Sequence, residues 1–505
     1  MSSVGQLEHH LPSQESRPEH HGRRKRTVST TEHILEEVER FGRRTISTSD
    51  LRKRLMSSGP SETSHLLSED EYTEILEGEE EEEELLGHTI SNTETIIHLL
   101  KGNIGIGVLT MPIAMSNAGL LGGVLGMVLV ALITIHCMHT LVISSHKMVD
   151  KKDGVRFLDY ADTAEAAFND AGGWWAKSAK FFGRLINLFL CMSQIGSNAV
   201  YILFVAQNIL PIVETYLSPG WNYRIYIAIL LIPVILTCCV RNLKYLSPLS
   251  VVANILEFVG LGIIFYFIFA TPLPSSDTRP WFSSAANFPI FFGTAIFAFE
   301  GISVVLPIEN QMTTKKAMLG FNGVLNTSMV IIACLYISMG FFGYLKYGDD
   351  VESSITLNLP ADSPLAQSAL VMFSLAIFFS YALQFYVVMD IIGPNLIKPY
   401  VPERLYMPAE YTTRILLNVF TLGLAATVPW LDLLVSLLGA VKMSTLSLMA
   451  PALIETSANW STDTRTKCIF RSLKNSFIFL VGLLGCIIGT YISLLEIVKK
   501  FQEPE

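Results

Sequence analysis

Apolar stretches of membrane-spanning length recur along most of this chain. From about residue 96 onward they alternate with short polar connectors, and each holds roughly the 20 apolar residues that a helix needs to cross the hydrocarbon core of a bilayer. The pattern predicts eleven spanning helices, over residues 95–117, 120–146, 182–210, 223–240, 247–271, 288–310, 321–345, 365–391, 411–429, 431–454 and 472–497. We therefore expect an all-α polytopic membrane protein.

The first and the sixth of these stretches are interrupted. Gly102, Gly105 and Gly107 interrupt the first, and Glu300 followed by Gly301 interrupts the sixth. Lipid offers no hydrogen-bond partner to an unwound backbone, so such segments persist only inside a protein or along a water-filled cavity. Two interrupted helices in matching positions are typical of transporters that are built from two repeats.

The first break has the features of a site for an anion. Its glycines and Asn103 let the backbone leave helical geometry at little steric cost. The half-helix that starts near Val108 then directs its unpaired N–H groups and the positive end of its dipole at the gap. This arrangement suits a carboxylate, and an amino acid presents one. The alternative is that the glycines only permit close helix packing, which leaves the second break unexplained.

The composition is typical of a membrane protein, and most of its acidic excess lies near the amino terminus. Half of the residues are apolar and 16% are charged, while much of the acidity behind the net charge of −9 lies in the amino-terminal tail, including residues 79–84. This balance gives no indication of nucleic-acid binding. Residues 1–90 are polar with few aromatic side chains, so we expect a disordered tail with a short helix near residues 32–41. No cleavable signal precedes the first span, which is expected to direct insertion itself.

Basic residues predict the orientation in the membrane. Lys and Arg gather in every second connector, and the eighth carries Lys398, Arg404 and Arg414. Short basic connectors stay in the cytoplasm, so the amino terminus is expected there and the carboxyl terminus on the other side. The expected division is a disordered cytoplasmic tail over residues 1–90, an eleven-helix transporter domain over residues 91–498, and a short non-cytoplasmic tail over residues 499–505.

Short sequences in the tail resemble sorting signals. Residues 62–67 and 81–86 each end in paired leucines after acidic residues, and residues 72–75 resemble a tyrosine-based signal. Clathrin-adaptor sorting machinery reads such signals on cytoplasmic tails. They favour a lysosomal or late endosomal membrane, with the plasma membrane as the alternative. Chance composition of a polar tail is the other explanation for these sequences.

Three motifs carry a family resemblance. They are His98 to Gly105 (HLLKGNIG), Phe297 to Ile302 with Val304 to Asn310 (FAFEGI and VVLPIEN), and Ser380 to Tyr386 (SYALQFY). Together they resemble the proton-coupled amino acid transporters of the amino acid/auxin permease superfamily, and the resemblance covers roughly residues 95–497. It implies eleven helices in an inverted five-plus-five repeat like that of bacterial leucine transporters, with discontinuous first and sixth helices.

The resemblance also implies which residues act. His98, one turn before the first break, is the candidate proton-coupling histidine, and its reference pKa of about 6.5 lies between an acidic compartment and neutral cytosol. A neutral, hydrogen-bonded histidine is the alternative. Glu300, a lone carboxylate among apolar neighbours, either carries the proton or braces the broken helix. The expected substrate-binding residues are Gly102, Asn103, Ile104, Gly105, Gly107, Phe297, Phe299, Gly301 and Tyr381.

Further charged residues lie within the predicted spans. Lys101 shares a helix face with the candidate histidine and either balances a carboxylate or reaches the cytoplasmic interface. The sequence assigns no role to Glu257 or Lys442. Lys442 also departs from the family pattern, as do Ile106 and Thr110, and these departures leave the substrate size and the coupling ion open.

These features favour symport of small neutral amino acids with protons towards the cytosol. Sodium-coupled transport on the same fold is one alternative, because carbonyl groups at a helix break also bind sodium. An amino acid sensor or scaffold that contacts growth-signalling proteins is another. No HExxH, GxSxG, Walker loop or metal-ligand spacing is present in the sequence, so we expect neither an enzyme nor a cofactor or metal.

Overall fold

The structure, a computed structural model, describes residues 90–152, 157–217, 220–241 and 243–502. Within these ranges every regular element is a helix, apart from one isolated backbone pairing between Ile90 and Met312. The helix expected over residues 32–41 and the sorting-like sequences of the tail lie outside the described residues. The prediction of an all-α protein is confirmed.

The α-helices and the short 3-10 and π-helical segments follow one another along the chain. They are α5 (Asn92–Asn103), α6 (Ile106–Leu109), α7 (Met111–Ala118), α8 (Leu120–Lys151), α9 (Tyr160–Ala171), α10 (Gly173–Leu217), α11 (Tyr223–Cys238), α12 (Leu243–Phe269), η1 (Ser276–Thr278), α13 (Phe288–Ala298), α14 (Ile302–Asn310), η2 (Lys315–Ala317), α15 (Val324–Tyr347), η3 (Gly348–Asp350), η4 (Ile355–Asn358), α16 (Pro364–Ile392), η5 (Gly393–Ile397), α17 (Glu403–Thr427), α18 (Leu431–Leu438), η6 (Gly439–Met449), α19 (Ala450–Trp460) and α20 (Arg465–Gln502).

Eight helical stretches in the described ranges are long and apolar enough to cross a membrane. They are Leu120–Lys151, Gly173–Leu217, Pro248–Phe269, Phe288–Asn310, Val324–Asp350, Pro364–Ile397, Leu431–Trp460 and Arg465–Gln502. The other three predicted spans are helical as well, but α5 to α7 are interrupted, α11 has only 16 residues, and α17 carries buried polar side chains. A multi-pass membrane protein is thus confirmed, and the count of eleven spans stays a prediction.

A buried polar face makes α17 less apolar than the other spans. Glu410, Arg414 and Asn418 follow each other at intervals of four residues, so they share one face of the helix, and all three are buried. Arg414 Nη2 lies 2.9 Å from Glu410 Oε1, and Arg414 Nη1 donates to the Cys238 carbonyl oxygen at 2.6 Å. Arg414, which the sequence places among the basic residues of a connector, therefore lies inside the bundle and joins α17 to α11.

The predicted discontinuities in the first and sixth spans are present. α5 starts with a capping box, in which the side chains of Ser91 and Glu94 accept from each other's backbone N–H. It ends at Asn103, and the extended backbone of Ile104, with φ −74° and ψ 118°, separates it from α6. In the sixth span, residues 299–301 separate α13 from α14. Both helices are therefore interrupted where glycine and polar residues enter the apolar stretch.

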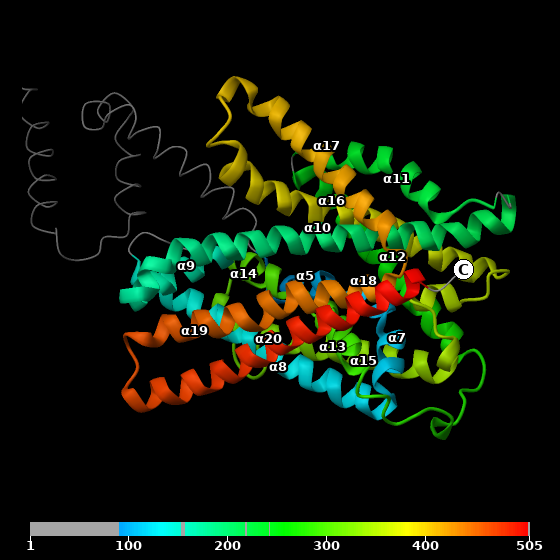
Figure 1. The fold of residues 1–505 in the computed structure, drawn as a ribbon, viewed down its shortest axis with the longest axis horizontal. Coiled ribbons are helices and arrows are strands. Elements are labelled where there is room, and N and C mark those ends of the chain that lie inside the picture. Colours follow the sequence, from blue (N-terminus) through cyan, green and yellow to red (C-terminus); the bar gives the residue numbers. More distant parts are fainter. Residues whose placement is uncertain (1–89, 153–156, 218–219, 242, 503–505) are drawn as a thin grey trace, which may run out of the picture. The chain divides into compact units, whose positions relative to one another are not determined.

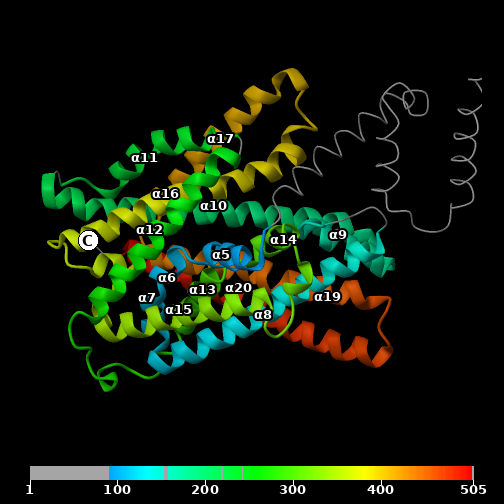
Figure 2. The same ribbon diagram turned by 180° about the vertical axis from the view of Figure 1, so that it is seen from behind.

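Helix α10 lies between two groups of helices. In Figure 1, α11, α16 and α17 lie on one side of α10, while α13, α18 and α20 lie on the other, and Figure 2 shows α13 and α20 on that other side from behind. α10 packs against α16 and α17 from the first group and against α18 and η6 from the second. The broken helices pack together as well, since α5 contacts α14 and α13 contacts both α6 and α7. α10 therefore contacts helices from both groups, including the segment η6 that packs on α13.

Exposed apolar side chains follow the outer faces of the bundle. On α20, Leu473, Phe477, Leu480 and Leu484 are each more than half exposed, at intervals of three and four residues. Soluble proteins rarely expose a continuous apolar stripe of this kind. This face of α20, like the other exposed apolar faces of the bundle, is therefore suited to contact with lipid.

Some helices extend beyond the apolar stretches that predict them. α10 begins at Gly173 rather than near residue 182, and its first turns include Lys177, Lys180 and Arg184. α20 continues to Gln502, into the segment expected to be a short tail. Lys and Arg are good helix formers, so the helical backbone continues where the hydrophobic pattern stops.

Candidate functional site

The two breaks meet inside the bundle. Gly301 donates its backbone N–H to Asn103 Oδ1 at 3.1 Å, so the side chain that ends α5 is bonded to the turn before α14. The Asn103 amide in turn donates to the Leu99 carbonyl oxygen at 2.8 Å, which fixes its orientation. Asn103 is only 5% exposed. It therefore satisfies a backbone N–H that the broken helix leaves free, in a place where lipid offers no partner.

A tyrosine on α15 bridges the same two breaks. Tyr336 is fully buried, and its hydroxyl oxygen lies 2.6 Å from the Asn103 carbonyl oxygen and 2.8 Å from the Ala298 carbonyl oxygen. These carbonyl groups end α5 and α13, where a helix leaves acceptors without intrahelical partners. One hydroxyl proton is shared between the two acceptors. The sequence does not single out Tyr336, because a tyrosine in an apolar span is also typical of a core.

The glycines at the breaks have different surroundings. A Cβ atom at Gly107 would lie 2.8 Å from Ala298 Cα, and a Cβ atom at Gly301 would lie 2.3 Å from Asn103 Nδ2. Gly105, in contrast, has no neighbouring atom within 4 Å of the position that a Cβ would take. Gly107 and Gly301 therefore allow close contact between the broken helices, whereas Gly105 borders open space.

Alanine substitutions of Gly107 and Gly105 should distinguish a glycine needed for close helix contact from one that borders open space. We expect Gly107→Ala to destabilise the protein by about 1–3 kcal/mol, the usual cost of overpacking, because the new methyl group meets the backbone of α13. Gly105→Ala should unfold close to the wild-type temperature. Thermal unfolding of the purified variants measures the difference. Equal unfolding temperatures would contradict the close approach of α6 to α13.

A buried ion pair lies beside the second break. Lys442 Nζ lies 2.9 Å from Glu300 Oε1, and the two side chains are 2% and 11% exposed. Ser197 on α10 donates its hydroxyl to Glu300 Oε1 at 2.8 Å and accepts a hydrogen bond from Lys442. Lys442 also donates to the Ser193 carbonyl oxygen at 3.2 Å. Glu300, a lone carboxylate in the sequence, is therefore paired with a cation in the structure.

The segment that carries Lys442 is π-helical and packs directly on α13. A Cβ atom at Gly439 would lie 1.9 Å from the Gly293 carbonyl oxygen, so η6 and α13 approach each other at their glycines. This contact places the Lys442 ammonium group 4.7 Å from the centre of the Phe297 ring. Widened turns of this type occur often at functional sites.

α5 and α12 each carry a charged side chain near the first break, Lys101 and Glu257 respectively. Glu257 is 5% exposed, and Lys101 is the opposite charge that acts on it. The neighbouring Gly102 packs against α14, since a Cβ atom there would lie 2.9 Å from Val304 Cγ2. Both explanations of Lys101, the balance of a carboxylate and contact with the cytoplasmic interface, stay predictions.

Two of the predicted site residues lie apart from the contacts at the breaks. His98 is exposed on α5, and within the described residues no hydrogen bond to its ring is present. Tyr381 on α16 is buried and donates its hydroxyl to Asn418 on α17 at 2.7 Å. The other predicted residues lie in or beside the breaks, namely Gly102, Asn103, Ile104, Gly105, Gly107, Phe297, Phe299, Glu300 and Gly301. All of their roles in binding and coupling stay predictions.

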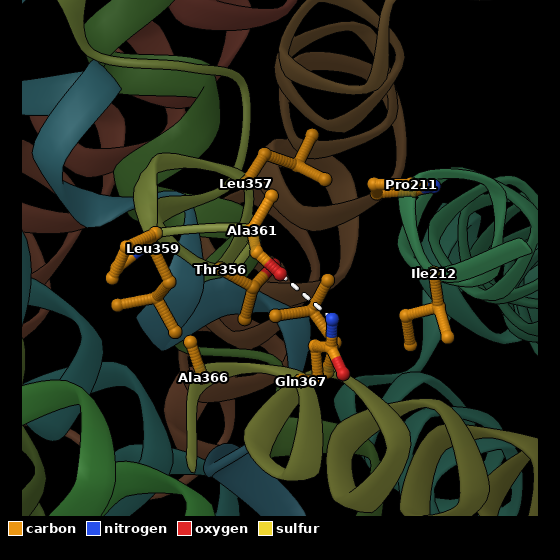
Figure 3. A pocket seen from close by; sticks show the side chains of 10 residues that line it. Pro211, Ile212, Thr356, Leu357, Leu359, Ala361, Ala366 and Gln367 are labelled. Atoms are coloured by element: carbon orange, nitrogen blue, oxygen red, sulfur yellow. Dashed lines mark hydrogen bonds between the residues drawn. The ribbon is translucent and has the colours of Figure 1, made fainter. Parts of the chain in front are cut away.

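A small cavity lies between the end of α10, η4 and the start of α16 (Figure 3), and none of its lining residues belongs to the breaks. Pro211, Leu357 and Ala366 line it, and Gln367 donates to the Ala361 carbonyl oxygen at 2.7 Å beside it. No charged side chain is among its lining residues. It therefore does not suit the two charged groups of an amino acid.

A larger cavity of about 600 Å³ is lined in part by α7, the helix that follows the first break. Its lining residues include Ile113 on α7 and Gln207 on α10, together with the charged side chains of Glu352, Asp432 and Lys500. The lining of this cavity therefore combines apolar side chains with acidic, basic and amide groups.

Comparisons with known proteins agree with these features. Residues 88–495 match the family model described as transmembrane amino acid transporter protein. A Drosophila melanogaster protein named proton-coupled amino acid transporter-like protein pathetic is 36% identical over 423 residues, which cover 83% of this chain and 88% of that protein. A Caenorhabditis elegans protein named probable amino acid transporter skat-1 is 24% identical over 434 residues, which cover 83% and 93% respectively.

Among solved structures, one similar chain is Mhp1, a nucleobase-cation-symport-1 family transporter in a closed conformation with bromovinylhydantoin bound. It aligns with a TM-score of 0.46 at 11% identity and covers 82% of this chain and 92% of its own. The family model, in contrast, matches almost the whole helical bundle. This chain therefore belongs to the transmembrane amino acid transporter family, whose members are transporters and not enzymes.

Proposed function

We propose that this protein is a secondary active symporter that moves small neutral amino acids together with protons towards the cytosol. The observation that carries the proposal is the buried meeting point of two broken helices at Asn103, Gly301 and Tyr336. Such breaks form the substrate and ion sites of many secondary transporters. The Drosophila relative is named for proton-coupled amino acid transport, which supports both the substrate class and the coupling ion.

The two charged ends of an amino acid suit the two sides of the breaks. The carbonyl ends of α5 and α13 carry the negative ends of the helix dipoles and favour an ammonium group, whereas the helical segments after the breaks favour a carboxylate. Gly105 borders open space between them. Ile104, Phe297 and Phe299 are buried apolar side chains beside the breaks, so they favour a small, neutral substrate.

Polar side chains on α10 offer further contacts. Gln194 Oε1 and both amide atoms of Asn198 are buried and have no hydrogen-bond partner among the described residues. A buried polar atom without a partner costs about 1–3 kcal/mol. A polar substrate that supplies these partners would recover part of that free energy on binding.

Uptake into proteoliposomes tests the substrate and the coupling ion together. A pH gradient that is acidic on the non-cytoplasmic side should drive accumulation of alanine, glycine or proline in sodium-free medium. His98→Ala should abolish this accumulation but preserve exchange at symmetric pH, because a histidine with a reference pKa of about 6.5 changes charge across such a gradient.

Three other outcomes would each contradict one part of the proposal, namely the coupling residue, the coupling ion or the transport function. Normal pH-driven accumulation by a well-expressed His98→Ala protein would exclude His98 from coupling and move that role to Glu300. Wild-type uptake that requires sodium and does not depend on the pH gradient would favour the sodium-coupled alternative. An amino acid that binds without being accumulated would favour a sensor.

We also propose the architecture and compartment that the sequence predicts, with eleven spans in an inverted five-plus-five repeat and a cytoplasmic amino terminus in a lysosomal or late endosomal membrane. The breaks in the first and sixth helical stretches support the repeat. With this orientation the cavity beside Lys500 opens to the non-cytoplasmic side, from which substrate enters. Cytosolic labelling of a carboxyl-terminal tag would contradict the orientation, and residence at the plasma membrane would contradict the compartment.

A further inference from the structure

The ammonium group of Lys442 is surrounded by atoms of the kind that bind a metal cation. Its partners are Glu300 Oε1 at 2.9 Å, the Ser193 carbonyl oxygen at 3.2 Å and the Ser197 hydroxyl oxygen. An ammonium group has three N–H donors, so these three oxygen atoms use all of them. The face of the Phe297 ring lies 4.7 Å from Nζ and adds a further favourable contact for a cation.

These groups form a built site inside the protein. Ser193, Ser197 and Lys442 are between 0% and 2% exposed, and Glu300 is 8% exposed. Two of the oxygen atoms come from α10 and one comes from the residues between α13 and α14, whereas the cation comes from η6. Carboxylate, carbonyl and hydroxyl oxygens at a broken helix are also the groups that hold sodium in sodium-coupled transporters.

We propose that Lys442 is a tethered cation, that it occupies a monovalent-cation site formed by Ser193, Ser197 and Glu300, and that it thereby makes transport independent of sodium. The inference rests on the proposed function, because it explains why protons rather than sodium couple to the substrate. An ion drives transport only if it binds on one side and leaves on the other. A covalently attached ammonium group does neither, so it blocks the site for a dissolved ion.

Removal of the tethered charge should expose the site to sodium. Lys442→Ser deletes the ammonium group and its stem and leaves the Glu300 carboxylate without a counter-charge. A ligand that binds only the folded state raises its apparent stability by mass action. In the full-length purified protein, the unfolding temperature of Lys442→Ser should therefore rise saturably when sodium chloride replaces choline chloride at equal ionic strength. The wild type should unfold at the same temperature in both salts.

Two further variants make this comparison specific. Lys442→Ser/Glu300→Gln lacks the carboxylate and should show no response to sodium. Lys499→Ser removes an exposed lysine at the end of α20 and should behave like the wild type in both salts. A sodium response in Lys442→Ser alone supports the tethered cation.

Several results would overturn the inference. One is a sodium-specific rise in the wild type, which would mean that Lys442 does not fill the site. Another is a Lys442→Ser protein that unfolds at one temperature in both salts. If Lys442→Ser is recovered in neither salt while the double variant is recovered in both, sodium does not replace the ammonium group and the inference fails. Because unfolding is measured instead of uptake, none of these results depends on whether a pH gradient drives transport.

Discussion

Replacement of Lys442 by methionine is expected to destabilise the protein by about 3–5 kcal/mol and to abolish uptake, because it leaves the Glu300 carboxylate buried without its cation. The double variant Lys442→Met/Glu300→Gln should recover most of that stability, since a neutral pair of similar volume often replaces a buried ion pair at little cost. Thermal unfolding in one detergent compares the wild type, the single variant and the double variant.

A matched control lies at the carboxyl end of α20. Lys499 and Glu496 form an ion pair of 2.6 Å, but the Lys499 side chain is 53% exposed. Exposed ion pairs contribute little, so Lys499→Met should unfold close to the wild type. A double variant that is no more stable than Lys442→Met would show that Lys442 and Glu300 are not energetically coupled.

Tyr336→Phe should reduce uptake strongly and lower the stability by about 1–3 kcal/mol, because the carbonyl groups that end α5 and α13 lose their shared buried donor. The apolar ring remains, so packing against Phe299, with ring centres 5.2 Å apart, is preserved. Uptake per reconstituted protein and thermal unfolding together measure the effect.

Tyr344→Phe is the control for this substitution. Tyr344 lies on the same helix and is 1% exposed. Within the described part of the chain its hydroxyl makes no hydrogen bond. Loss of the Tyr344 hydroxyl should therefore change uptake little. Equal losses of uptake in Tyr336→Phe and Tyr344→Phe would mean that removal of any buried hydroxyl from α15 is harmful. That result would contradict a specific role of the Tyr336 hydroxyl in bridging the two breaks.

The positions of both breaks follow from the sequence, because each is a local departure from an apolar run. Glycines, Asn103 and Glu300 interrupt segments that are otherwise continuous in hydrophobicity. The lengths of the apolar runs also give the approximate position of each helix. Helix ends are less predictable, since Lys177 and Lys180 continue α10 beyond its apolar part.

The partners across the bundle do not follow from the sequence. Lys442 and Glu300 are 142 residues apart in the chain, and no local spacing indicates that they meet. The sequence marks Lys442 as a charge within a span and as a departure from the family pattern, but it does not indicate a partner. Tyr336 has no distinguishing signal at all, because its role depends on two carbonyl groups that belong to other helices. Such contacts arise from the packing angle and register of whole helices, which hydrophobic patterns leave undetermined.

The backbone pairing at Ile90 has a mechanical consequence. Ile90 donates to the Gln311 carbonyl oxygen at 2.9 Å and accepts from the Thr313 N–H at 3.1 Å, so the start of α5 is fastened to the end of α14. These two half-helices also pack against each other along their length. A force applied to the chain just before Ile90 therefore acts on both half-helices at once. We expect α5 and α14 to rotate together as one unit about the two breaks.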